Sequence, residues 1–89
     1  MKVLSNNRQL YEYLLFLSSE LKERKREELG EAVVFASRQA ASNMNAEFLG
    51  ESRIALRRVL KEEGGALTAQ ERADLLDVLT QLDKAFEAR

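Results

Sequence analysis

The sequence contains no cysteine and no histidine. Without cysteine there is no disulfide, no thiol nucleophile and no thiolate ligand for a metal. Without histidine the common ligand sets for zinc, copper and haem are missing, and so are the Ser/His and Cys/His pairs of nucleophilic enzymes. We therefore predict that the chain is not an enzyme, and we expect no cofactor, no metal and no small-molecule substrate.

Proline is also absent, and only four of the 89 residues are glycine. Proteins built from strands and tight turns normally use more of both residues, whereas both of them damage helices. The sequence is rich instead in Ala, Leu, Glu, Arg and Gln, which are good helix formers. No segment alternates apolar and polar residues over the length of a half-buried strand. The composition therefore predicts an all-α fold.

Neither charge nor hydrophobicity builds up over long stretches. Fourteen basic and fifteen acidic side chains give a net charge of −1, so no overall field attracts nucleic acid or an anionic membrane. Apolar runs such as residues 14–17 are far shorter than the roughly 20 residues of a membrane span. The polar residues that follow Leu4 do not fit a signal peptide. We expect a cytoplasmic protein without membrane contact, and the missing cysteines suit that compartment.

Apolar residues recur at helical spacing in four segments, which predict one domain over residues 1–89. We expect a small bundle of four antiparallel amphipathic helices. The predicted helices cover residues 6–25, 26–42, 46–63 and 69–87. Their expected buried stripes are Leu10, Leu14, Leu17 and Leu21; Leu29, Ala32, Val33, Ala36 and Ala40; Phe48, Ala55, Leu56 and Val59; and Leu75, Val78, Leu79, Leu82 and Phe86. Side chains expected at the edges of these stripes are Tyr13, Leu49 and Leu60.

The second segment is distinguished by its small apolar side chains, which let a neighbouring helix approach closely. Phe35 flanks this stripe, and we expect it to fill a gap at the centre of the bundle. The boundary before this segment is less well defined. Residues 22–26 read Lys-Glu-Arg-Lys-Arg, and cations favour the negative C-terminal end of a helix. The sequence leaves open whether the first two helices are separate or continuous.

Capping residues mark the other boundaries. The expected N-cap of the first helix is Ser5 or Asn6, and that of the third is Asn43 or Asn45. The third helix is expected to end at the glycine pair 64–65, because glycine adopts the left-handed conformation that helix C-termini favour. The segment 68–71, Thr-Ala-Gln-Glu, has the pattern of a capping box and predicts the start of the fourth helix.

Three large side chains of the first helix lie outside its leucine stripe. At about 100° per residue, Tyr11 and Leu15 fall to one side of the stripe and Phe16 to the other. One interpretation is that this helix is central and wrapped by its neighbours. The other is that these side chains form a surface for a partner or for self-association, since clustered exposed aromatic residues commonly mark one. The sequence alone leaves both open.

Two rows of charge on the last two helices have no obvious partner. Arg53, Arg57 and Lys61, with Arg58 beside them, form a basic column on the third helix, and like charges at this spacing repel each other. The fourth helix carries an acidic row of Glu71, Asp74 and Asp77. The two rows lie on opposite flanks of their stripes, which do not meet in a simple antiparallel pair. Internal pairing, plain solvation and a surface of both signs for a partner all remain open.

The sequence therefore favours a non-enzymatic helical protein that acts through protein–protein contacts. Regulatory, adaptor and toxin-neutralising proteins of this size share that description. The expected partner is another protein or a second copy of the chain, in a homodimer. The alternative is a weak nucleic-acid-binding accessory protein that uses the basic residues of the third helix, but four cations beside several acidic residues are a weak footprint for nucleic acid.

Overall fold

A computed structural model describes residues 7–41 and 45–87, and all regular structure within them is helical. The predicted all-α bundle of four helices is confirmed. Its helices are α1 (Asn7–Glu23), α2 (Glu27–Arg38), the 3₁₀ turn η1 (Gln39–Ala41), α3 (Asn45–Glu62) and α4 (Ala69–Glu87). The expected N-caps Ser5, Asn6 and Asn43 lie outside the described residues, and Asn45 is the first residue of α3.

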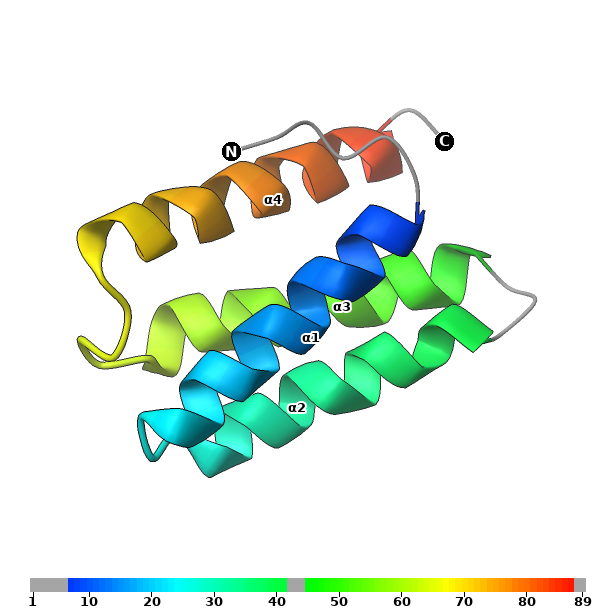
Figure 1. Cartoon of the computed structure of the whole chain (residues 1–89). Helices are drawn as coiled ribbons and strands as arrows, with labels where there is room; N and C mark the ends of the chain where they lie inside the picture. Colours follow the sequence, from blue (N-terminus) through cyan, green and yellow to red (C-terminus); the bar gives the residue numbers. More distant parts are fainter. Residues whose placement is uncertain (1–6, 42–44, 88–89) are drawn as a thin grey trace.

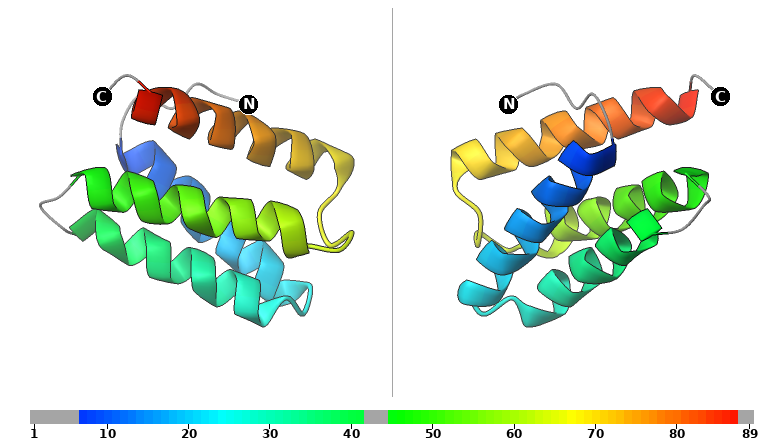
Figure 2. Two further views of the ribbon diagram at one scale, coloured as in Figure 1. Left: turned by 180° about the vertical axis from the view of Figure 1, so that it is seen from behind. Right: turned by 45° about the vertical axis from the view of Figure 1, so that its right-hand side comes forward.

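The helices are arranged as a layer with one helix across it. α3 lies between α2 and α4, and successive helices run in roughly opposite directions (Figures 1 and 2). α1 crosses the layer obliquely, from the C-terminal end of α4 to the N-terminal end of α2 (Figures 1 and 2). One side of α1 therefore faces the layer, and the opposite side is the outer surface of the bundle.

The core lies between α1 and the layer and consists mainly of the predicted leucine stripes. Buried apolar side chains of the core cluster are Leu10, Leu14, Leu17, Leu21, Leu29, Val33, Phe48, Leu56, Val59, Leu67, Leu75, Val78, Leu79 and Leu82, with Tyr13, Leu49 and Leu60 packed at its edges. Leu67, in the loop before α4, is a core residue that the helical periodicity did not predict. The side chain of Phe86 lies outside what the structure describes.

Two predictions for the second helix are wrong. Phe35 does not fill the centre of the bundle but is 56% exposed, and Ala40 is exposed as well. At about 100° per residue, Phe35 is 200° from the buried Val33 and so points away from the core. The gap that it was expected to fill does not arise, because α1 and α3 pack closely against the small side chains of α2.

The close approach of α1 and α2 is centred on Gly30. A Cβ atom at this position would lie 2.7 Å from Cγ of Lys22 and 3.1 Å from the carbonyl oxygen of Ser18. Both distances are shorter than ordinary packing allows, so only glycine fits without a shift. Ser18 at this contact and Ser37, about two turns further along α2, are both buried, and each hydroxyl donates to a carbonyl of its own helix, at 2.8 and 2.7 Å.

The first two helices are separate, and a tight turn joins them. α1 ends in a Schellman motif, in which the Arg26 amide donates to the Leu21 carbonyl (2.8 Å) and the Lys25 amide to the Lys22 carbonyl (3.1 Å). Lys25 takes the left-handed position of this motif, with φ of 64°. Glycine is the usual residue there, which is why the sequence did not show the break.

Replacement of Lys25 by glycine is expected to raise the free energy of unfolding by about 0.5–1 kcal/mol. A residue with a Cβ atom loses roughly 1–2 kcal/mol in the left-handed conformation, and the greater freedom of glycine in the unfolded chain offsets part of the gain. Urea unfolding followed by circular dichroism measures the change. Lys25→Ala is the matched control, and equal stability of the two variants would contradict the explanation.

The loop between α3 and α4 is organised by a buried carboxylate. Glu63 is only 4% exposed, and its Oε1 accepts hydrogen bonds from the amides of Gly65 (2.9 Å) and Leu67 (3.0 Å). Its Oε2 accepts from Arg72 at 2.6 Å. Gly64 and Gly65 have φ of 57° and 87°, so they end α3 as predicted. This network holds Leu67 in the core and brings the start of α4 back over the bundle.

A second network connects the α1–α2 turn to the start of α4. The predicted capping box is present: the Glu71 amide donates to Oγ1 of Thr68 (3.1 Å), and the Thr68 amide to Oε1 of Glu71 (2.8 Å). Arg24 donates to both carboxylate oxygens of Glu71 (2.5 and 2.9 Å), to Glu20 (2.8 Å) and to the Ala66 carbonyl (3.0 Å). Arg24 therefore joins the end of α1 to the segment 66–71, which is far from it in the sequence.

Candidate functional site

The outer side of α1 carries three of the exposed large hydrophobic side chains that the core does not use. Tyr11, Leu15 and Phe16 are 37%, 40% and 56% exposed. The interpretation in which the first helix is wrapped on several sides is therefore wrong for the described residues, since the buried apolar side chains of α1 are those of its leucine stripe. The other interpretation, a surface for a partner, stays a prediction.

The neighbouring helices show which way each of these side chains points. Lys22 binds Glu31 of α2 at 2.6 Å, and this flank of α1 also carries Tyr11 and Leu15. The opposite flank carries Phe16 together with Arg24, which binds α4. Tyr11 and Leu15 thus lie along the α1–α2 pair, whereas Phe16 lies toward α4. The outer surface of α1 thus has Tyr11 and Leu15 along one edge and Phe16 along the other.

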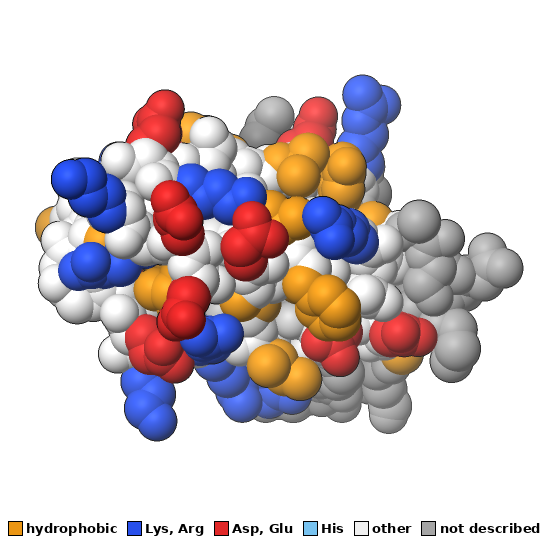
Figure 3. Space-filling view, turned by 90° about the horizontal axis from the view of Figure 1, so that it is seen from below, with side chains coloured by type: hydrophobic (Ala, Val, Ile, Leu, Met, Phe, Trp, Pro, Cys, Tyr) orange, Lys and Arg blue, Asp and Glu red, His pale blue; other side chains and the backbone are white. Residues whose placement is uncertain are grey.

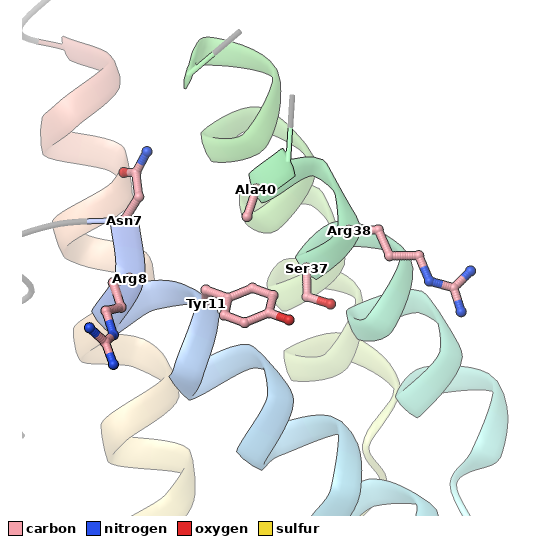
Figure 4. A pocket seen from close by; sticks show the side chains of 6 residues that line it. All are labelled: Asn7, Arg8, Tyr11, Ser37, Arg38 and Ala40. Carbon is pink, nitrogen blue, oxygen red and sulfur yellow. The ribbon is translucent and has the colours of Figure 1, made fainter. Parts of the chain in front are cut away.

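Tyr11 also lines an open groove where the start of α1 meets the end of α2, here called the α1–α2 groove. Its volume is about 660 Å³, and its lining residues are Asn7, Arg8, Tyr11, Ser37, Arg38 and Ala40. The Tyr11 ring reaches from α1 toward Ser37, while the guanidinium groups of Arg8 and Arg38 extend outward on opposite sides (Figure 4). The groove is therefore lined by the aromatic ring of Tyr11 and has a cation on each of its two sides, its banks: Arg8 on α1 and Arg38 on α2.

The face around α2 is mixed in character. Hydrophobic side chains appear there in separate small groups with charged side chains between them, and most of these groups lie in the half nearer the grey residues (Figure 3). The structure also exposes Phe35 on α2 and Ile54 on α3, the latter by 64%. No continuous apolar patch covers the part of this face that the structure describes.

The basic column of α3 is largely neutralised within the chain. Asp83 of α4 binds Nε of Arg53 at 2.6 Å and a terminal nitrogen of Arg57 at 3.1 Å. Arg58 lies 3.3 Å from Glu62 and 3.8 Å from Glu28. Lys61 is exposed. The column thus pairs mainly with Asp83, which the sequence analysis did not select. Asp83 lies on the flank of α4 that faces α3, so the position of this flank could have indicated it.

The first two residues of the acidic row of α4, Glu71 and Asp74, lie toward α1 instead. Glu71 binds Arg24, which, with the Thr68 amide, lowers the pKa of this carboxyl group to about 2. Burial, and then the charges of Asp74 and Glu71, raise the pKa of the Tyr13 hydroxyl, which places this part of the row beside α1. Asp74 also accepts a hydrogen bond from Gln70 (3.1 Å), and Asp77 is half-buried. The two rows therefore do not form one exposed surface of both signs.

The polar networks around Glu63 and Arg24 have a structural role, because their groups bind the loop and turn segments of the chain itself. Across the part of the chain that the structure describes, no three carboxylates come together in a way that could hold a metal ion. None of the described helices combines the length and the apolar composition needed to cross a membrane. No protein family model, no curated protein and no solved structure matches the chain significantly.

Proposed function

We propose that the chain is a non-enzymatic helical protein that acts through protein–protein contacts made by the outer side of α1. The observation that carries this proposal is the exposure of Tyr11, Leu15 and Phe16 on a helix that already buries a complete leucine stripe. These side chains add little to the core, yet they present apolar surface to water, which is unfavourable in proportion to its area. Aromatic side chains are enriched in the buried centres of protein interfaces.

Binding of nucleic acid by α3 has less support. Two arginines of the column share Asp83, and a third lies between two glutamates. A phosphate would have to displace these carboxylates. In the basic segment 22–26, Lys22 and Arg24 bind Glu31 and Glu71. A protein partner, or a second copy of the chain, therefore fits the distribution of charge better. A cytoplasmic location of the chain stays a prediction.

Replacement of Leu15 by glutamate is expected to abolish binding of the partner and to leave folding intact. The new carboxylate would be buried in the proposed interface when the partner binds. In the monomer the position is exposed, so we expect the free energy of unfolding to change by no more than about 0.5 kcal/mol. The measurement is capture of proteins from the native cell extract on the immobilised chain, compared between variants by quantitative mass spectrometry. Light scattering of each variant shows whether the partner is a second copy.

Ile54→Glu is the matched control, because it places the same charge at an exposed aliphatic position on α3. The proposal requires that a protein retained by the unmodified chain and by Ile54→Glu is lost from Leu15→Glu. Retention of the same proteins by Leu15→Glu would overturn it. If Leu15→Glu unfolds, the milder Tyr11→Ala serves in its place, and thermal unfolding of each variant shows which applies.

A further inference from the structure

The α1–α2 groove has a chemistry that the rest of the α1 surface lacks. The Tyr11 ring and the methyl group of Ala40 are the apolar parts of its lining. The hydroxyl of Ser37 already donates to the Val34 carbonyl at 2.7 Å, so this hydroxyl does not require a polar ligand. The volume of about 660 Å³ lies in the range of ligand sites and exceeds that of one large side chain. The groove can therefore admit an apolar side chain together with its neighbours.

The charge around the groove is of one sign. Arg8 and Arg38 stand on its two banks, and none of the described residues that line it is acidic. Arg8 has only a long contact of 3.9 Å with Glu12, in which both side chains are well exposed, and such pairs are weak. Near Arg38, the pKa of Glu31 is lowered chiefly by the hydrogen bond and charge of Lys22, 2.6 Å away, and only then by Arg38. Both guanidinium groups thus remain suited to an external carboxylate.

We propose that the α1–α2 groove binds a segment of the partner protein in which an apolar side chain is flanked by aspartate or glutamate. The apolar side chain packs on Tyr11, and the carboxylates pair with Arg8 and Arg38. Guanidinium groups hold carboxylates through two parallel hydrogen bonds, which fixes the orientation of the segment as well as its charge. This inference rests on the proposed function and adds the chemistry of the partner.

The test is selection of random peptides, displayed on phage, against the full chain. We expect the enriched peptides to carry an aromatic or aliphatic residue beside Asp or Glu. They should bind Arg8→Glu/Arg38→Glu at least about tenfold more weakly than the unmodified chain, a loss typical of removed charge pairs. Their binding should also shift the amide resonances of Tyr11, Ser37 and Ala40 in NMR spectra.

The control variant is Lys61→Glu/Lys84→Glu, which replaces two exposed cations elsewhere and changes the net charge equally, from −1 to −5, since each substitution contributes −2. Binding within about twofold of the unmodified chain is expected for it, because only the overall field changes. Equal weakening by both double variants would overturn the proposal, and so would the absence of enriched peptides, enrichment of basic ones, or resonance shifts that map elsewhere.

Failure of this inference is distinguishable from failure of the proposed function. If Leu15→Glu loses the natural partner but the selection yields no acidic and apolar peptide, the groove proposal falls and the function of the α1 surface stands. If Leu15→Glu keeps the natural partner, the proposed function itself falls. If light scattering shows that the partner is a second copy of the chain, the groove proposal is likewise overturned.

Discussion

Replacement of Glu63 by alanine is expected to lower the free energy of unfolding by about 3 kcal/mol, a large share of the roughly 5–10 kcal/mol that holds a domain of this size together. The carboxylate is only 4% exposed and accepts hydrogen bonds from two backbone amides and from Arg72. Alanine leaves the Leu67 amide without its acceptor in a buried position, and an unmet buried donor costs about 1–3 kcal/mol. Leu67 then loses its fixed place in the core.

Urea unfolding followed by circular dichroism measures this effect. Glu62→Ala is the matched control, since Glu62 is the preceding residue, is exposed and pairs with the exposed side chain of Arg58 at 3.3 Å. We expect it to change stability by less than about 0.5 kcal/mol. Glu63→Gln keeps an acceptor for the amides but removes the charge, so it should fall between the two. Equal losses for Glu62→Ala and Glu63→Ala would show that the network contributes nothing.

Replacement of Glu71 by glutamine is expected to reduce stability at neutral pH by about 2 kcal/mol and to flatten its dependence on acid. Its carboxylate closes the capping box and holds Arg24, and a hydrogen bond to a charged group contributes roughly 1.5–3 kcal/mol. The pKa of Glu71 is lowered from 4.5 to about 2, first by the hydrogen bond from Arg24. A lowered pKa gives stability that is complete above the unfolded value and is lost as the pH falls through the folded one.

The stability of the unmodified chain should therefore decline between about pH 5 and pH 2, and this decline should be shallower in Glu71→Gln. Some acid dependence remains in the variant, because the pKa of Glu63 is also lowered, chiefly by the hydrogen bond from the Leu67 amide. The measurement is urea unfolding at several pH values. Glu12→Gln, which alters a long contact between two well-exposed side chains, should retain the full decline. Parallel pH profiles for Glu71→Gln and the unmodified chain would refute the linkage.

Local chemistry made much of this fold predictable. The capping box needs only Thr68 and Glu71 at the right spacing, and the leucine stripes need only the helical period, so both could be read from neighbouring residues. The turn at Lys25 could not, because lysine has no preference for the left-handed conformation. Contacts remote in the sequence hold it there: Arg24 binds Glu71, and Arg26 donates to the Glu63 carbonyl at 3.2 Å.

The candidate site was harder to predict for a similar reason. The sequence placed Tyr11, Leu15 and Phe16 outside the leucine stripe, but their exposure depends on where α2, α3 and α4 lie around α1. The partner of Arg53 and Arg57 likewise depends on the rotation of α4, which turns Asp83 toward α3 and Glu71 away from it. The α1–α2 groove is formed by two segments, residues 7–11 and 37–40, whose relative position depends on how the two helices pack.

The contact at Gly30 also bears on how relatives of this chain could be recognised. Leucine stripes occur in many helical bundles and distinguish few of them. A glycine inside a helix is different, because it weakens the helix by about 1 kcal/mol and is retained only where packing demands it. Small residues at positions 18, 30 and 37 together record this particular crossing of two helices. A search that weights those three positions above the leucines would find sequences that share the geometry.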